Sequence, residues 1–192
     1  MKGSYHHGAL KSALIDRAIG HLDRGVRITE LSVRSLAAEI GVSKGAPYRH
    51  FPTADALIAA VAARGFTLLT RDMDATDGSL EAIGVAYVRF AHRKRELYRA
   101  MYHLPQAEIA VFPDLVQAAS GAYERLSAAI ARVERRTGAL RVSHGKAATA
   151  AWSYVHGLAG LIINELSVAV STDDEDTVTE LMSILARGIA SC

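Results

Sequence analysis

Residues 31–52, LSVRSLAAEIGVSKGAPYRHFP, decide the fold. Their pattern predicts two short helices joined by a tight turn. Ser32 is placed to cap the first helix, because its hydroxyl oxygen can accept a hydrogen bond from the free amides of the opening turn. Gly41 can leave that helix with a positive φ, and Ser43 is placed to cap a second helix over residues 44–50. This is the helix-turn-helix arrangement, whose second helix has the size to lie in the major groove of DNA.

The side chains of the predicted second helix favour DNA recognition over an ordinary pair of helices in a bundle. Its small residues allow the backbone to approach a base edge or a phosphate, and Tyr48, Arg49 and His50 offer a hydroxyl, a guanidinium and an imidazole to phosphates or guanine. A polar N-terminal arm, residues 1–8, could reach phosphates or the minor groove, or could be a frayed terminus. The predicted DNA-binding residues are Lys2, Tyr5, Thr29, Ser32, Arg34, Ser43, Lys44, Gly45, Ala46, Pro47, Tyr48, Arg49 and His50.

Two runs of residues and one spaced set resemble a known family. The runs Tyr5-His-His-Gly-Ala-Leu10 and Gly41-Val-Ser-Lys-Gly-Ala-Pro-Tyr-Arg-His-Phe51 resemble the N-terminal domain of the TetR/AcrR family of bacterial repressors. Trp152, His156 and Gly157 resemble the Trp-His-Gly (WHG) signature of one C-terminal subgroup. The resemblance implies a homodimeric transcriptional regulator, a repressor released from its DNA operator by a small-molecule effector.

Pro47 departs from the family pattern, because many members carry Leu or Ile at this position. Proline removes a backbone donor near the start of the second helix. That helix is therefore expected either to begin one turn late or to open as a 3₁₀ helix.

Composition and charge agree with a DNA-reading head attached to a different body. The 192 residues are 50% hydrophobic, enough for a core in one or two domains. The net charge is +2, divided as +4 on residues 1–52 and −2 on the remainder. Cys192 is the single cysteine, which excludes an internal disulfide framework. Because no apolar run has the length of a membrane span and no signal-peptide layout is present, a cytoplasmic protein with no membrane partner is expected.

Apolar residues recur at helical spacing along the whole chain, and period-two alternation is absent. The sequence therefore predicts an all-α protein of about nine helices. A three-helix helix-turn-helix DNA-binding domain, residues 1–53, precedes a larger helical effector-binding and dimerisation domain, residues 54–192. Outside residues 31–52, helices are expected at about residues 9–24, 54–74, 96–103, 113–137, 146–166 and 175–190, and a further helix after Ser79 is expected to carry Ile83, Tyr87 and Phe90 on one face.

The last two predicted helices are apolar on more than one face. The family resemblance implies that they pair with their copies as a four-helix dimer interface. From the sequence alone, two consecutive apolar helices could equally form intramolecular core.

The resemblance also implies a small-molecule pocket in the body. Aromatic and methionine side chains with a few polar groups suit a small apolar or amphipathic effector, although each of these residues could instead be ordinary core. The predicted ligand-binding residues are Tyr87, Phe90, Met101, Tyr102, His103, Phe112, Tyr123, Trp152, His156 and Asn164.

Two alternatives stay open. An enzyme would need a recognisable site, yet the sequence has no His-x-x-x-His or Glu-x-x-His pair, Gly-x-Ser-x-Gly elbow, Walker loop or dinucleotide fingerprint. We therefore expect no catalytic residues, no metal site and no cofactor. The second alternative is a DNA-binding protein whose body is filled and takes no effector.

Overall fold

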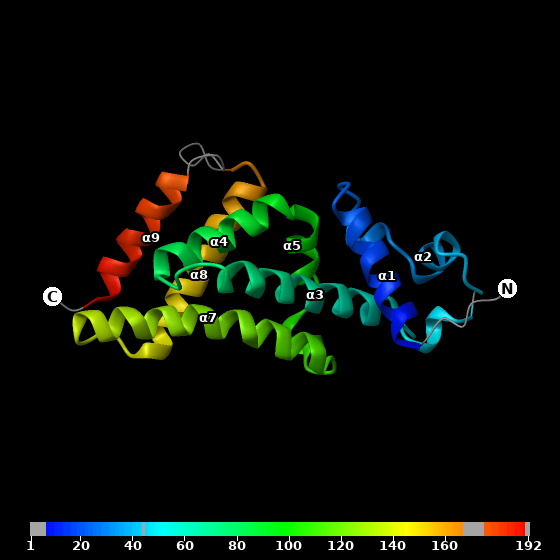
Figure 1. The fold of residues 1–192 in the computed structure, drawn as a ribbon, viewed down its shortest axis with the longest axis horizontal. Coiled ribbons are helices and arrows are strands. Elements are labelled where there is room, and N and C mark those ends of the chain that lie inside the picture. Colours follow the sequence, from blue (N-terminus) through cyan, green and yellow to red (C-terminus); the bar gives the residue numbers. More distant parts are fainter. Residues whose placement is uncertain (1–6, 44, 167–174, 191–192) are drawn as a thin grey trace. The chain divides into compact units, whose positions relative to one another are not determined.

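The computed structural model describes residues 7–43, 45–166 and 175–190 (Figure 1). Within these residues the chain forms nine α-helices and two short 3₁₀ segments, and β-structure is limited to an isolated bridge between Leu140 and Ala190. The predicted all-α class is confirmed. In chain order the elements are α1 (His7–Leu22), η1 (Ile28–Glu30), α2 (Val33–Glu39), η2 (Pro47–Arg49), α3 (Ala54–Asp74), α4 (Leu80–Arg93), α5 (Arg95–Met101), α6 (Gln106–Ile109), α7 (Pro113–Thr137), α8 (His144–Ile163) and α9 (Glu175–Ile189).

Short-range chemistry sets the helix ends. Ser32 caps α2 in a capping box, in which the Ser35 amide donates to the Ser32 hydroxyl at 3.0 Å and the Ser32 amide donates to the Ser35 hydroxyl at 3.3 Å. Gly41 follows α2 with φ +73°, a conformation that side chains with a Cβ disfavour. The Ala56 amide donates to the Thr53 hydroxyl at 3.1 Å, which caps the start of α3.

The predicted helix bounds outside the helix-turn-helix lie within three residues of the observed ones, and α6 has no predicted counterpart. Contacts divide the chain into two compact units. The first unit contains residues 1–65 and 94–118, and the second contains residues 66–93 and 119–192. Both α3 and α7 therefore contribute residues to each unit, and the predicted boundary at residue 53 falls inside the first.

The core of the first unit is built around α1. Its residues at spacing four, including Leu14 and Ala18, are fully buried, and α1 contacts α2, η2 and α5. Phe51 is buried directly after η2. The helix-turn-helix therefore rests on a continuous apolar layer, which holds its exposed face in a defined conformation.

The core of the second unit is centred on α4, which contacts both α8 and α9 (Figure 1). Tyr87 and Phe90 of α4 are buried, as are Leu126 and Ile130 of α7. No described helix combines the length and the apolar character needed to cross a membrane.

Candidate nucleic-acid interface and ligand sites

The turn that should read DNA differs from the predicted second helix. A helix over residues 44–50 is the wrong prediction, because the structure has only the 3₁₀ segment η2 there. The predicted cap is also wrong: Ala46 is the N-cap residue of η2, without a side-chain cap. The sequence left two possibilities for the start of this helix, a start one turn late or an opening as a 3₁₀ helix. The structure shows the 3₁₀ form.

Proline accounts for this local structure. Pro47 has no amide to donate back to residue 43, and instead the Ala46 amide donates to the Ser43 carbonyl at 3.1 Å. Only after the proline does the chain recover helical hydrogen bonds, when the amides of His50 and Phe51 both donate to the Pro47 carbonyl at 2.9 Å. The segment is therefore a single tight turn that presents few side chains.

The structure places most of the predicted DNA-binding residues at the surface of the first unit. Tyr48 is 47% exposed. Ala46 and His50 are half-buried, whereas the side chain of Pro47 is buried beneath the turn. Lys2, Tyr5 and Lys44 lie outside the described residues. The exposed members are Thr29, Ser32, Arg34, Ser43, Gly45, Tyr48 and Arg49.

The charges of this face favour an anionic partner. Glu39 lies 2.9 Å from the His21 Nε2 and 3.7 Å from an Arg17 guanidinium nitrogen, so this carboxylate has a cation beside it. Arg34 and Arg49 are exposed and have no ion-pair partner in the part of the chain that the structure describes. Their guanidiniums are available to phosphates or to a guanine edge.

The predicted ligand-binding residues divide between the two units, and only some of them meet. Met101 packs close to Gly65 in the first unit, Tyr102 packs on Tyr98 with ring centroids 5.2 Å apart, and His103 is exposed. The members in the first unit are Met101, Tyr102, His103 and Phe112; those in the second are Tyr87, Phe90, Tyr123, Trp152, His156 and Asn164.

Four of these residues, Tyr87, Tyr123, Trp152 and His156, form an aromatic cluster in the second unit. The Trp152 ring lies 5.8 Å from that of Tyr87 and 5.9 Å from that of Tyr123. The Tyr87 hydroxyl is 3.3 Å from the His156 Nδ1, and burial lowers the pKa of His156. Asn164 is exposed, and its side-chain amide donates to the Gly160 carbonyl at 2.9 Å.

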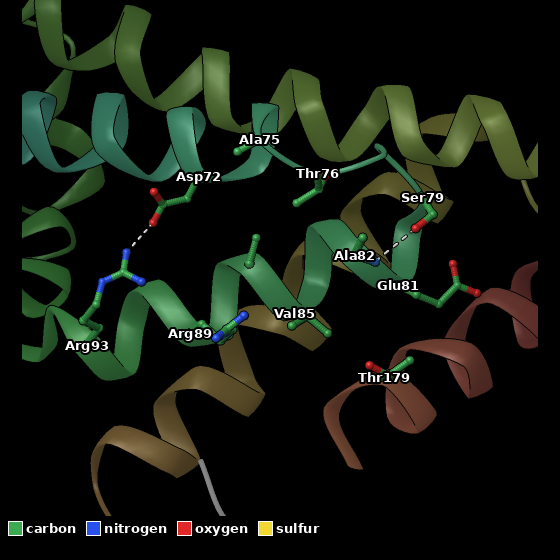
Figure 2. Close-up of a pocket in the computed structure, with 11 residues that line it drawn as sticks. Asp72, Ala75, Thr76, Ser79, Glu81, Ala82, Val85, Arg89, Arg93 and Thr179 are labelled. Atoms are coloured by element: carbon green, nitrogen blue, oxygen red, sulfur yellow. Dashed lines mark hydrogen bonds and ion pairs between the residues drawn. The ribbon is translucent and has the colours of Figure 1, made fainter. Parts of the chain in front are cut away.

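A groove that the sequence did not predict lies elsewhere in the second unit (Figure 2). It has a volume of about 580 Å³ and runs between the end of α3, one face of α4 and the start of α9. The sequence signal was present in the three- and four-residue spacing along α4, but such a face is equally typical of exposed helix surface. The lining residues are Asp72, Ala75, Thr76, Ser79, Glu81, Ala82, Val85, Ala86, Arg89, Arg93 and Thr179.

Metal binding finds no support among residues 7–43, 45–166 and 175–190. No three His, Cys, Asp or Glu side chains there are grouped so that they could hold an ion.

Comparison with known proteins identifies the family. Residues 28–61 match the bacterial regulatory proteins of the tetR family, and residues 80–185 match the tetracyclin repressor-like C-terminal domain. The chain therefore belongs to the TetR family, and it is a DNA-binding transcriptional regulator. Membership of the Trp-His-Gly subgroup stays a prediction.

Solved structures agree with this fold. A protein with unknown function from Rhodococcus sp. RHA1 is 30% identical, with a TM-score of 0.77 over 99% of this chain and 100% of that chain. A bacterial regulatory protein in the tetR family from Rhodococcus RHA1 is 17% identical (TM-score 0.65; 95% and 97% covered). The TetR family transcriptional regulator PfmR from Thermus thermophilus is 18% identical (TM-score 0.58; 93% and 99% covered). No curated protein matches the chain.

Proposed function

We propose that the protein is a repressor that binds a pseudo-palindromic operator as a homodimer and is released by a small-molecule effector. The observation that carries this proposal is the exposed surface of the TetR-family head, where Arg34 of α2 and Tyr48 and Arg49 of η2 are exposed to solvent. Two such heads would occupy successive major grooves. Phosphate contacts would supply most of the affinity, which would therefore fall steeply with salt. Residues 1–53 would be the DNA-binding domain and residues 54–192 the effector and dimerisation domain, acting on chromosomal DNA in the cytoplasm.

The surface of α8 and α9 supports dimerisation through the last two helices. Leu161 of α8 is 47% exposed and Ile184 of α9 is 55% exposed. Gly157 and Gly160 have open space where a Cβ would lie, so a partner helix could approach α8 closely there. Such apolar side chains around small residues are typical of a helix face that is covered in an oligomer.

Effector release would use the helix that both units share. We propose that an effector bound in the second unit shifts α3 and so changes the spacing of the two heads. This requires the effector to bind the DNA-incompetent state more tightly than the other. The aromatic cluster supports an apolar site, because its rings combine with the polar Tyr87–His156 pair. An unchanged distance between the heads on effector release would exclude this mechanism.

The first experiment is binding of the purified protein to DNA fragments from around its own gene, against random DNA, at two salt concentrations. Preference for one fragment, with protection of a two-fold-related site, is the expected result. Weak binding that is equal on all tested DNA, including genome-wide fragments, would contradict the regulator mechanism. A melting-temperature shift with small molecules would then separate a sensor from a DNA-binding protein with a filled body.

One observation favours the enzyme alternative. The Ser127 Oγ lies 2.8 Å from the His144 Nε2, and the His144 Nδ1 lies 3.5 Å from a Glu134 oxygen. The hydrogen-bonded series Ser127, His144, Glu134 matches the series of a nucleophile, a general base and a carboxylate that orients the base. However, Ser127 and Glu134 lie within α7, whose interior amides are engaged in the helix and cannot stabilise an oxyanion.

We therefore propose that the contacts of His144 with Ser127 and Glu134 stabilise the packing of the start of α8 on α7, and that these residues are not catalytic. Hydrolysis of p-nitrophenyl acetate should be equally slow for the wild type and for Ser127→Ala. A rate that depends on Ser127 would restore the enzyme alternative.

A further inference from the structure

We propose that the groove between α3, α4 and α9 binds a small amphipathic amine, with its ammonium group beside Glu81. All the residues that line the groove belong to the second unit. The site is separate from the aromatic cluster, since none of the four cluster residues lines it. The effect of this ligand on DNA binding rests on the proposed function above, whereas the binding itself does not.

The space for an apolar chain comes from small side chains. Ala75 follows the last turn of α3, and Ala82, Val85 and Ala86 lie at three- and four-residue spacing on α4. Short side chains at all four positions leave a space of about 580 Å³, which is within the usual range for small-molecule sites. The four together give the groove an apolar floor.

Four charged side chains line the groove, and they differ in their pairing. The Arg93 guanidinium donates to Asp72 at 2.5 Å, so the charges of this pair offset each other. Arg89 also has an interaction of its own. Glu81, in the first turn of α4, has neither a hydrogen bond nor an ion pair within residues 7–43, 45–166 and 175–190. Among these residues, the charge that the groove leaves without a partner is therefore negative.

Two hydroxyl groups of the lining also favour a hydrogen-bond donor. Figure 2 shows Ser79 and Glu81 at the same end of the groove. The Ser79 hydroxyl donates to the Asp77 carboxylate, and the Thr76 hydroxyl donates to the Met73 carbonyl, both at 2.7 Å. Because the protons of both hydroxyls are engaged, their remaining lone pairs can only accept. An ammonium group has three donors and no acceptor, so it suits this lining.

This arrangement selects the charge and the position of the ligand. A carboxylate forms strong charge-assisted hydrogen bonds with an ammonium group, and an apolar chain attached to that group would lie along the apolar floor. Arg89 is eight residues beyond Glu81 on α4, or about 12 Å along the helix axis. That separation exceeds the Debye length of about 8 Å at physiological salt, so Arg89 repels an ammonium group beside Glu81 only weakly. An anionic ligand would instead be repelled by Glu81.

The position of the groove also suggests how its ligand could act. Thr76 and Ser79 lie in the connection between α3 and α4, and Thr179 lies on α9. A ligand in the groove would therefore contact the end of the helix that both units share and the helix proposed for dimerisation. Operator affinity should change when the groove is occupied.

The test is calorimetric titration of the full-length protein near neutral pH with butylamine, hexylamine and octylamine, against hexanol and hexanoate. Amine affinity should rise about three- to fourfold for each added methylene that is buried. Hexylamine should bind at least about tenfold more tightly than hexanol because of its charged hydrogen bonds, and hexanoate should bind more weakly than hexanol. Equal affinities for hexylamine and hexanol would overturn the proposal.

Two variants locate the site. Glu81→Gln keeps the shape of the side chain and removes its charge, so it should weaken hexylamine at least about tenfold and leave hexanol unchanged. The matched control is Glu108→Gln, at an exposed position of the first unit, which should alter neither affinity. Ala82→Leu fills the groove with a good helix former and should prevent hexylamine binding, and helicity measured by circular dichroism checks that it folds. Hexylamine affinity that survives both Glu81→Gln and Ala82→Leu would overturn the proposal.

Operator binding separates the two proposals. Sequence-specific binding measured without any amine tests the regulator alone. If hexylamine saturates the groove and operator affinity does not change, the site stands and the link to release fails. If hexylamine binds nowhere while the operator is recognised, the groove proposal fails and the regulator stands.

Discussion

At the scale of single residues, Arg49 and Lys44 are expected to contribute differently to DNA binding. Arg49 is exposed at the end of η2 and can reach a base edge, while Lys44 is expected from the sequence to contact phosphate. Arg49→Ala should weaken operator binding by about 1–3 kcal/mol and relax the sequence preference. Lys44→Ala should weaken specific and random DNA alike and lower the salt slope by about one. Fluorescence anisotropy at several salt concentrations measures both.

The control for this pair is Arg135→Ala, which removes an exposed positive charge from the second unit. It should leave both affinities unchanged. Equal losses on all DNA sequences for the Arg49 and Lys44 variants would contradict the division of roles.

His156 is expected to give the free energy of unfolding a pH dependence. Its pKa is lowered by burial from the ordinary value of 6.5, so below that pH the unfolded chain binds more protons than the folded one. The free energy of unfolding should therefore fall as the pH falls from 6.5 towards the lower folded-state pKa. His156→Gln keeps a partner for the Tyr87 hydroxyl and should reduce this slope, measured by urea unfolding between about pH 5 and 8.

Replacement of the exposed His103 by glutamine is the matched control and should leave the slope unchanged. A slope that is identical in the wild type and in His156→Gln would show that His156 is not its source.

At the scale of elements, the closeness of α4 and α9 depends on Gly84. A Cβ at this position would lie 2.5 Å from the Cε and 2.6 Å from the Cγ of Met182. Gly84→Ala should therefore destabilise the protein by about 1–3 kcal/mol through overpacking, which exceeds the gain of about 1 kcal/mol in helix propensity. The midpoint of urea unfolding at fixed protein concentration measures the change.

Gly121 of α7 provides the comparison, because a Cβ added there would meet no heavy atom within 4 Å outside its own helix backbone and chain neighbours. Gly121→Ala should stabilise the protein by up to about 1 kcal/mol. If both alanine variants stabilised the protein, the inference that α4 and α9 pack closely at Gly84 would be wrong.

Helices were predicted well where local signals are strong. The bounds of α3 and α7 agree with the prediction, because Thr53 caps one helix and Pro113 begins the other. The second helix of the helix-turn-helix was predicted too long, because its pattern of small and polar residues outweighed the missing amide of Pro47.

At the scale of the whole molecule, substitutions on the exposed surface of α8 and α9 should prevent the proposed dimer from forming. Leu161→Glu together with Ile184→Glu places charges at two exposed apolar positions of α8 and α9. Desolvating these charges in an interface is unfavourable, so the variant should be monomeric and should lose most of its operator affinity. Size-exclusion chromatography with light scattering measures its mass.

Val142→Glu is the control, since Val142 is 44% exposed in the connection between α7 and α8. It should remain dimeric. A Leu161→Glu, Ile184→Glu variant that keeps the mass of a dimer would move the interface to another surface.

The sequence by itself determined the helical class, the approximate bounds of the helices outside the helix-turn-helix, and the family resemblance. These properties depend on short-range hydrogen bonds, on apolar spacing and on motifs that are contiguous in the chain. Only the tertiary structure decided that Tyr87, Tyr123, Trp152 and His156 meet while Asn164 does not, and that Asp72, Ala82 and Arg93 border one groove. Such groupings depend on how helices distant in sequence cross, and crossing geometry follows from the packing of many side chains together.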